Sequence, residues 1–535
     1  MLGQIIDILL LLAFSFLSRL PFVMVPAGDT RVHLWQIKKA KTRGIGGYET
    51  FQSVIKGFNA YPNFFHWVLS KLPEGRAYLI GIMACIGFDI VGVLFVYALL
   101  EYLIGSGALP LPMGMDAHHL SFMGAILYAS TPVFFPVIQR LKTISGRTLG
   151  NFLSIGYFAS LYGMMYLHPV AFLGCLVFGL LILMSSQFAM QVMVLFSLGM
   201  TLYSWSVYPI AVLLGVVLIG LLIPRTGTYK LFVMKINHYQ WYFDMLRLKK
   251  SPVAKRNSFS DLLKLPIDIF RNPDRAIESL FRNNTLLIAV LSVPMMVYMI
   301  YDISMYPERM QMFRDQSLLA FLAGLVCCSL GAFVLTSFRP FKLLGEAERY
   351  FDYGAPALIV VFLVYVLRWD PAHSDVLMTR FLLLNLCVIA MNFLYLNLNR
   401  LKRSFLPEPI GEMKPLIDYF EALKSNRNTL VIPTKDNFTL GTFVSNPHAR
   451  FYYPYTSDGK LNAFNRLKDD EVYVNFPTPD LGHFVNKYDV NTLVLDKRFA
   501  KDAKDSMGVD YADALRTWRK EFENERYVIY GILDT

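Results

Sequence analysis

The chain has 535 residues, of which 55% are hydrophobic and only 17% are charged. Soluble globular proteins are nearer to half apolar and about a quarter charged, and here the apolar excess is gathered into long uncharged runs such as 169–184 and 209–223. A run of about 18 or more apolar residues can cross a bilayer. The composition therefore excludes a soluble enzyme, a disulfide-stapled secreted domain and a disordered protein, and it predicts a polytopic α-helical membrane protein.

Hydropathy and helix-breaking residues predict about eleven membrane spans. They lie near residues 5–24, 78–103, 118–138, 148–166, 169–184, 188–204, 208–223, 285–303, 318–338, 355–367 and 379–398. The first lacks a basic n-region and a cleavage site, so it is expected to be an uncleaved span. Between 148 and 223 the run is broken into pieces barely long enough to cross, at Gly163, 168–169, 185–186 and 208–209, and some pieces are expected to be half-helices. The five cysteines fall in apolar runs and are expected to be buried small hydrophobic residues.

Hydrophilic stretches divide the chain into two predicted domains. Residues 1–399 form the transmembrane domain, with a first interfacial loop at 25–77 and a basic loop at 224–283. Residues 400–535 form a small soluble α/β domain, because helical and strand-like periods alternate there. Its helices are expected at 415–424 and around Leu515 and Trp518, and its strands at 429–433, 449–455, 490–496 and 526–533.

The formal net charge of +11 lies entirely in residues 1–399, since the 20 basic and 20 acidic residues of 400–535 cancel. This surplus suits anionic lipid headgroups or a phosphate-bearing substrate, and it equally suits ordinary loops that flank membrane spans. With eleven spans, the basic loops and the C-terminal domain share one face of the membrane. The positive-inside rule would place that face in the cytoplasm, although the rule weakens for long loops.

The segment after the first span carries an acidic, a basic and an imidazole side chain: Asp29, Arg31 and His33. From Thr30 onward the sequence predicts an interfacial helix, whose lysines are expected to reach toward lipid headgroups (Lys38, Lys39 and Lys41). Asp29 is then either the N-cap of this helix or a general base.

Two further islands carry cations on the same predicted face. One precedes a late span and contains Glu346, Glu348, Arg349 and Tyr350. It is either a phosphate site, because a guanidinium pairs bidentately with phosphate, or a surface ion-pair cluster that contributes little. The other is the loop 139–147, which suits a phosphate and equally a plain basic loop (Arg140, Lys142 and Arg147).

The segment 28–33, together with 60–73 and its Tyr61, Pro62 and His66, resembles the first external loop of the GT-C superfamily of integral membrane glycosyltransferases. Asn63 stands where a second proline is common in that loop. The island around Arg349 resembles the Arg-Tyr…Pro element of these enzymes, and the C-terminal domain resembles the small α/β domain after their last span. The resemblance implies a GT-C-like fold and a polyprenyl-phosphate-linked sugar as donor.

The resemblance also implies roles for particular residues. It makes Asp29 the catalytic base and places Arg349 at the donor phosphate. Further candidates for the phosphate are Arg31, Arg140, Lys142 and Arg147, and the residues expected to support the site are His33, Tyr61, His66, Glu346, Glu348 and Tyr350. No metal ligand and no cofactor are assigned, because an isolated aspartate gives no ground for a divalent metal.

The leading interpretation is an inverting glycosyltransferase that moves a sugar from polyprenyl phosphate to an acceptor hydroxyl at the membrane surface. Its partners would be the lipid-linked sugar, membrane lipid and a glycan, lipid or protein acceptor, with no role for nucleic acid. The resemblance implies that the site and the C-terminal domain lie on the periplasmic face of a bacterial inner membrane, or on the lumenal side in a eukaryote, which conflicts with the charge distribution. Two other classes stay open: a transporter or flippase for lipid-linked substrates, which would depend on Asp89 within a span, and a non-catalytic GT-C-like scaffold.

Overall fold

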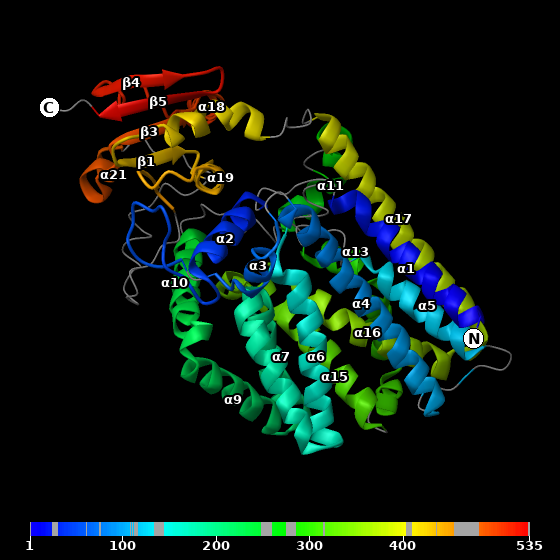
Figure 1. Ribbon diagram of the computed structural model, residues 1–535. Coiled ribbons are helices and arrows are strands. Elements are labelled where there is room, and N and C mark those ends of the chain that lie inside the picture. Colours follow the sequence, from blue (N-terminus) through cyan, green and yellow to red (C-terminus); the bar gives the residue numbers. More distant parts are fainter. Residues whose placement is uncertain are drawn as a thin grey trace. The chain divides into compact units, whose positions relative to one another are not determined.

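The structure is a computed structural model that describes residues 2–23, 30–59, 61–73, 76–107, 109, 111, 116–132, 144–247, 259–273, 276, 285–313, 316–402, 409–434, 436–453 and 481–532. The chain forms two compact units, whose elements are labelled in Figure 1. The helical unit comprises residues 1–27, 76–224 and 242–399. The α/β unit comprises residues 28–75, 225–241 and 400–535.

The helical unit is built from apolar helices, which satisfy their backbone N–H and C=O groups internally, as a bilayer requires. They are α1 (Leu2–Val23), α4 (Ala77–Gly105), α5 (Ala117–Ala129), α6 (Gly146–Tyr166), α7 (Phe172–Ser185), α8 (Gln187–Ser204), α9 (Tyr208–Leu222), α13 (Thr285–Ser292), α14 (Pro294–Met305), α15 (Ser317–Ser337), α16 (Arg349–Trp369) and α17 (Ser374–Lys402). An amphipathic helix, α11 (Phe259–Arg271), belongs to the same unit, and α10 (Thr228–Arg247) starts in the α/β unit and ends in the helical one.

Within the part of the chain that the structure describes, six helices are long and apolar enough to cross a membrane: Gly3–Leu20, Ala77–Gly105, Gln187–Ser204, Ser317–Ser337, Arg349–Trp369 and Pro371–Leu394. Two shorter apolar helices cover Pro169–Ser185 and Tyr208–Leu222. The protein is therefore an integral membrane protein, as its composition predicted, but the predicted number of eleven spans is not confirmed. One reason is Pro294, which divides the predicted span 285–303 into α13 and α14 because proline has no N–H to continue a helix.

The breaks predicted at 168–169, 185–186 and 208–209 are confirmed, but the break predicted at Gly163 is wrong, because α6 (Gly146–Tyr166) continues through this residue. α6 ends before Pro169. Ser186 separates α7 from α8 and caps α8, because its Oγ accepts a hydrogen bond from the N–H of Ala189 at 3.3 Å. Trp205 adopts a left-handed φ of 50° between α8 and α9. The segment consequently folds back and forth as four consecutive helices.

α16 is the most deeply buried helix of the unit, since its whole apolar window is enclosed by protein. α15 packs against it, and the two helices approach closely because Gly354 has no side chain. A Cβ atom there would lie 2.6 Å from the side chain of Ser329. A buried ion pair, 3.2 Å between Arg19 Nε and Asp89 Oδ2, joins α1 to α4. Asp89 thus has a structural partner inside the helical unit.

All five cysteines are free thiols. Three are buried, as the sequence predicted: Cys85, Cys175 and Cys328. Cys327 and Cys387 are exposed on the surface of the protein, so the prediction of burial is wrong for them. Both belong to apolar helices, where composition alone does not distinguish an exposed position from a buried one.

The α/β unit contains a five-stranded sheet in the order β2-β1-β3-β5-β4, with strands β1 (Arg427–Ile432), β2 (Ala449–Phe451), β3 (Thr492–Asp496), β4 (Trp518–Glu523) and β5 (Tyr527–Ile532). β1 runs parallel to β2 and β3, and β5 runs antiparallel to β3 and β4. The helices of the unit are α18 (Pro409–Glu421), α19 (Asp436–Phe443), α21 (Leu481–Tyr488) and α22 (Lys497–Met507), besides α2 (Thr30–Arg43) and α3 (Phe64–Leu69). The predicted small C-terminal α/β fold is confirmed.

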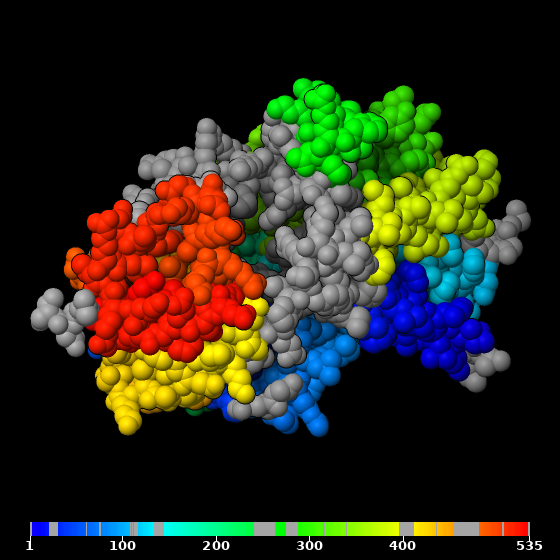
Figure 2. Space-filling view, turned by 90° about the horizontal axis from the view of Figure 1, so that it is seen from above, coloured from blue at the N-terminus to red at the C-terminus, as the bar shows by residue number. Residues whose placement is uncertain are grey.

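The two edges of this sheet are protected in different ways. β4, drawn in red with β5 in Figure 2, is an exposed edge whose charged side chains disfavour pairing with another chain. At the other edge, Phe451 of β2 donates its N–H to Gln52 O at 2.9 Å and accepts a bond from the N–H of Val54 at 3.0 Å. The first loop of the chain therefore covers the β2 edge.

The helix expected around Leu515 and Trp518 is wrong. The helix between β3 and β4 is α22, which starts after the capping side chain of Asp496 and ends at Gly508 in a left-handed conformation. Leu515 lies in a turn, and Trp518 begins β4, opposite Ile532 of β5. The antiparallel ladder with β5, the next strand along the chain, supplies backbone hydrogen bonds, and these outweigh the local helical spacing.

The helix predicted from Thr30 is confirmed as α2, but its surroundings differ from the prediction. Trp35 packs in the core of the α/β unit, with its ring centroid 4.6 Å from that of Tyr453. Lys38 Nζ donates to the carbonyl oxygens of Gly441 and Val444 at 3.1 and 2.6 Å. The expectation that Lys38 and Lys39 reach toward headgroups is therefore wrong, because the helix packs on protein. The division of the sequence at residue 400 stays a prediction, while the structure groups residues 28–75 with the tail.

Candidate functional site

Three of the predicted supporting residues form a buried aromatic cluster in the α/β unit. His33 of α2 and His66 of α3 stack with ring centroids 5.1 Å apart, and His33 Nδ1 lies 2.9 Å from His66 Nε2. Tyr61 meets both imidazoles edge-on, at 5.8 and 5.7 Å. These residues were predicted from two separate segments of the sequence. In the folded chain they lie together near the start of α2.

Burial controls the charge of this cluster. It lowers the pKa of His66 well below 6.5, and the neighbouring His33 lowers that pKa further. Burial also lowers the pKa of Lys39 to about 7, and Lys39 Nζ donates to Asn59 O at 2.5 Å. His66 is therefore neutral near pH 7, so the imidazole pair is a hydrogen-bonded unit that holds α2 against α3.

Asn63 fixes this loop by two side-chain hydrogen bonds. Its Nδ2 donates to Gly44 O at 3.3 Å, and its Oδ1 accepts a bond from the N–H of Gly46 at 3.3 Å. These two bonds tie the start of α3 to the turn after α2. A proline side chain has neither a donor nor an acceptor, so the asparagine fixes the loop by hydrogen bonds instead of by ring rigidity.

Arg31, a predicted phosphate ligand, is paired with a carboxylate in the same unit. Its Nη1 lies 2.6 Å from Asp436 Oδ1, and the Asp436 side chain is completely buried. The hydroxyl of Tyr527 donates to the other oxygen of Asp436 at 3.4 Å. Arg31 thereby joins α2 to α19, and Asp436 in turn joins α19 to β5.

Three of the predicted site residues lie outside the described residues: Asp29, Arg140 and Lys142. The residue next to Asp29 is described, because α2 begins at Thr30, whose side chain is buried. Arg147 is described as well, in the first turn of α6 after the cap formed by Ser145.

Three helices of the helical unit start close together. A Cβ atom on Gly146 at the start of α6 would lie 2.1 Å from the backbone oxygen of Ser185, next to the cap of α8. Asn151 of α6 donates from Nδ2 to the carbonyl oxygen of Asp352 in the first turn of α16, at 3.5 Å. The first turns of α6, α8 and α16 are therefore neighbours, and we refer to this region as the helix-start cluster.

Arg349 is the first residue of α16 and belongs to the helix-start cluster. Its guanidinium pairs with Glu346 and lies 5.9 Å from the ring centroid of Phe188 on α8. Tyr350 packs on the same ring at 4.9 Å and donates its hydroxyl to Leu344 O at 3.1 Å.

The remaining cations and carboxylates of this region have distinct positions. Arg147 is half-buried in the first turn of α6, whereas Glu348 is buried. The structure thus places Arg147, Glu346, Glu348, Arg349 and Tyr350 around neighbouring helix starts. The helix N-termini and the two arginines favour an anion here, while the carboxylates of Glu346 and Glu348 oppose it. Phosphate binding therefore requires Arg349 to turn from Glu346 to the phosphate.

Some residues that hold each of these two regions together were not predicted from the sequence. Asp436 lies some 400 positions from Arg31 in the chain, and no motif linked them. Gln191, an amide within an apolar helix, donates to Leu344 O at 3.1 Å and so ties α8 to the segment before α16. A polar side chain in an apolar span was the one available hint for Gln191. Among the described residues, no group of three or more His, Cys, Asp or Glu side chains has the arrangement of a metal site.

Comparisons with known proteins identify the fold. No protein-family model matches the sequence, and no curated protein matches it significantly. The oligosaccharyltransferase of Archaeoglobus fulgidus, in complex with Zn and sulfate, aligns with a TM-score of 0.51 and 11% identity over 98% of this chain and 73% of its own. The same archaeal enzyme, AglB, in complex with an inhibitory peptide and a dolichol-phosphate, aligns with a TM-score of 0.50 and 11% identity over 99% and 74%.

ArnT from Cupriavidus metallidurans, bound to undecaprenyl phosphate, aligns with a TM-score of 0.49 and 12% identity over 99% of this chain and 98% of its own. AglB and ArnT are both membrane glycosyltransferases of the GT-C superfamily. At these identities the similarity concerns the fold. The chain has the GT-C fold, as the sequence predicted, with helical and α/β parts that match along nearly its whole length.

Proposed function

We propose that the protein is a GT-C glycosyltransferase that moves a sugar from a polyprenyl-phosphate donor to an acceptor hydroxyl. The observation that carries the proposal is the helix-start cluster, in which Arg349 and Arg147 lie at the first turns of neighbouring helices in a protein with the GT-C fold. The donor phosphate would bind there, with its lipid tail in the bilayer. The solved structures of this fold contain dolichol-phosphate in AglB, which supports the same class of donor here.

The proposed reaction is one displacement at the anomeric carbon. The acceptor oxygen forms the new bond to that carbon, the bond to the phosphate oxygen breaks, and Asp29 takes the acceptor proton. Arg349 stabilises the negative charge that develops on the departing polyprenyl phosphate. A single displacement inverts the anomeric centre and needs no covalent intermediate, so no nucleophilic side chain is required.

Seven of the other predicted residues have a role in this proposal. Arg147, with Arg140 and Lys142 of the preceding loop, would add positive charge near the phosphate. Glu346 would orient the guanidinium of Arg349. His33, Tyr61 and His66 would fix the start of α2 and with it the position of Asp29, since His33 is within about one turn of helix of Asp29 in sequence and stacks on the other two rings.

A transporter or flippase is less well supported. That class would use an acidic side chain within a span, and Asp89 was the deepest such residue in the sequence. In the structure Asp89 forms a buried ion pair with Arg19. Because this pair neutralises the carboxylate and joins two helices, it has the properties of a structural contact.

The proposed location is a bacterial inner membrane, with the helix-start cluster and the α/β unit on the periplasmic side. Protease access to a C-terminal tag on intact and permeabilised cells tests this orientation. A tag that is cleaved on cells with only the outer membrane permeabilised supports it, and a tag protected until the inner membrane is opened contradicts it.

Reconstitution of the purified protein with a polyprenyl-phosphate-linked sugar separates the three functional classes. A glycosyltransferase releases polyprenyl phosphate and forms a glycosylated acceptor or free sugar over many turnovers. A flippase moves the donor between leaflets without changing it, and a scaffold binds it without either effect. Release of polyprenyl phosphate that depends on Asp29 is the expected result, and transport of intact donor would contradict the proposal.

A further inference from the structure

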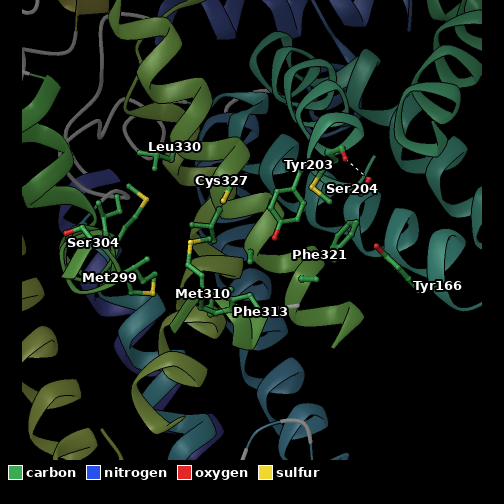
Figure 3. A pocket seen from close by; sticks show the side chains of 18 residues that line it. Tyr166, Tyr203, Ser204, Met299, Ser304, Met310, Phe313, Phe321, Cys327 and Leu330 are labelled. Atoms are coloured by element: carbon green, nitrogen blue, oxygen red, sulfur yellow. Dashed lines mark hydrogen bonds between the residues drawn. The ribbon is translucent and has the colours of Figure 1, made fainter. Parts of the chain in front are cut away.

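An apolar cavity of about 640 Å³ lies within the helical unit, between α8, α14, α15 and α16. Figure 3 shows Met299 and Ser304 on one side of it and Tyr203 and Phe321 on the other, with Cys327 between them. A volume of this size falls in the range of about 300–1,000 Å³ that is typical of sites for small organic molecules. The cavity is therefore large enough for a ligand.

The lining specifies a hydrocarbon. None of the 18 lining residues is charged. The hydroxyls of Ser204 and Ser304 donate to backbone oxygens of their own helices, those of Met200 and Tyr301, each at 2.6 Å. Four methionines line the space (Met200, Met296, Met299 and Met310), and unbranched thioether side chains adapt to a flexible apolar chain.

The cavity lies toward the ends of α6 and α8, away from the helix-start cluster. Tyr166 is the last residue of α6, and Tyr203 and Ser204 end α8. The turn after α8 carries Trp205, which is 93% exposed, and α9 begins with the exposed Tyr208. Tyrosine and tryptophan concentrate at the boundary between hydrocarbon and headgroups, so these helix ends mark a membrane interface.

We propose that this cavity binds one acyl chain of a phospholipid from the leaflet in which α6 and α8 end. The chain would lie among the methionines, and the headgroup would stay at the interface marked by Tyr166 and Tyr203. α6 has 21 residues, or about 30 Å of helix, so a phospholipid at this end is separated from Arg147 by most of the bilayer. The site is thus distinct from the proposed donor site, and it does not depend on the proposed function.

Photo-crosslinking in nanodiscs tests the proposal. A phosphatidylglycerol with a diazirine in its acyl chain is expected to label peptides of α14 and α15 that line the cavity. Ala320→Phe, which fills the cavity from α15, should reduce this labelling at least fivefold. Gly331→Phe is the matched control, because Gly331 is on the same helix with open space around its Cβ position and lies outside the lining. Gly331→Phe should leave the labelling of the cavity unchanged. Neither variant should change the labelling of lipid-facing residues of α17.

Two results would overturn the proposal. Labelling of the lining that is the same in wild type and Ala320→Phe would show that no chain enters. Loss of the phospholipid label on addition of equimolar polyprenyl phosphate would assign the cavity to a prenyl tail.

The unmodified protein gives a second test if Ala320→Phe does not fold. Cys327 lines the cavity and Cys387 faces outward on α17. In detergent, added phosphatidylglycerol should slow alkylation of Cys327 by a hydrophobic maleimide at least threefold and leave Cys387 unchanged. Equal effects on the two thiols would contradict the proposal.

Discussion

Two arginines that the sequence proposed for phosphate binding have different surroundings in the two units. In the α/β unit, Arg31 pairs with Asp436, whose side chain is fully buried and also accepts a bond from Tyr527. In the helical unit, Arg349 pairs with Glu346, which is three residues away and about one fifth exposed (21%). One pair joins distant segments of the chain, and the other lies within a single helix start.

The two arginines differ in the free-energy cost of leaving the carboxylate with which each is paired. A buried carboxylate that loses its cation is left uncompensated, which costs several kcal/mol, so Arg31 is committed to the fold. The Glu346 carboxylate keeps about a fifth of its exposure (21%), so water can partly solvate it when Arg349 turns to another anion, whereas the Asp436 carboxylate is fully buried. Arg349 is consequently the better candidate for a phosphate ligand, and Arg31 is expected to act through stability.

The largest expected effect is on catalysis by Asp29→Asn. Asparagine keeps the size and the capping ability of the side chain but does not accept a proton. We expect near-complete loss of sugar transfer, with normal expression and unchanged melting temperature, measured on the purified protein. Wild-type turnover by this variant would make Asp29 a helix cap and would require another base.

Arg31→Ala is expected to have the largest effect on stability. It leaves the buried carboxylate of Asp436 without its cation, and breaking such a pair costs about 3–5 kcal/mol. The value should be near the lower limit, because the Arg31 side chain is 23% exposed. Thermal unfolding in detergent measures it, with Asp436→Asn as the milder companion because it removes the charge at the same time. If Arg31→Ala and Arg349→Ala lower the melting temperature equally, the contrast between the two pairs is wrong.

Arg349→Lys is expected to reduce kcat/KM about tenfold to a hundredfold. Lysine keeps the charge but loses the bidentate geometry, and charge-assisted pairs contribute roughly 1.5–3 kcal/mol. Arg349→Ala should be worse, and Glu346→Gln should matter less. Steady-state kinetics on the reconstituted protein measure these effects. A lower melting temperature with unchanged kinetics would show that the contact with Glu346 is structural.

The smallest expected effect is a dependence of stability on pH through the imidazole cluster. The pKa of His66 is lower in the folded protein than its ordinary 6.5. As the pH falls below about 6.5, the unfolded chain takes up a proton that the folded chain does not, so stability decreases toward pH 5. The pKa of Lys39 is about 7 in the folded protein instead of 10.5. Lys39 therefore also decreases stability as the pH falls, but this decrease occurs at higher pH and is largely complete by pH 7.

The melting temperature between pH 7 and 5 measures the His66 contribution. Each kcal/mol lost from the free energy of unfolding should lower the melting temperature by about 2–4 °C for a unit of roughly 200 residues. His66→Gln should flatten the curve. Parallel curves for wild type and His66→Gln would show that His66 does not titrate differently in the folded and unfolded states.

Local patterns predicted much of the fold. The start of α2 at Thr30, the breaks at Pro169 and Ser186, and the strands of the C-terminal sheet all depend on short-range chemistry: capping, proline and period-two hydrophobicity. The surroundings of these elements were not predictable in the same way. Lys39 looked like a surface lysine, yet it is buried against Asn59 and Trp35.

The candidate site shows the same limit. Local motifs pointed to Arg349, His33, Tyr61 and His66, and the structure places them in defined clusters. No motif indicated Asp436, because that partner comes from another segment and only tertiary folding brings it to Arg31. The sequence predicts which residues can bind a phosphate. It does not predict which of them already pair with a carboxylate in the folded protein, because such partners come from distant segments of the chain.

The central claim is that the donor phosphate binds at the helix-start cluster, and one binding measurement tests it most directly. Sugar-free polyprenyl phosphate is titrated into the protein in nanodiscs, comparing wild type, Arg349→Ala and Arg368→Ala. Arg368 is the matched control, since it lies in the last turn of the same helix, α16. We predict that Arg349→Ala weakens binding at least tenfold, or about 1.4 kcal/mol, and that Arg368→Ala binds like wild type. Equal affinity of Arg349→Ala and wild type would contradict the account.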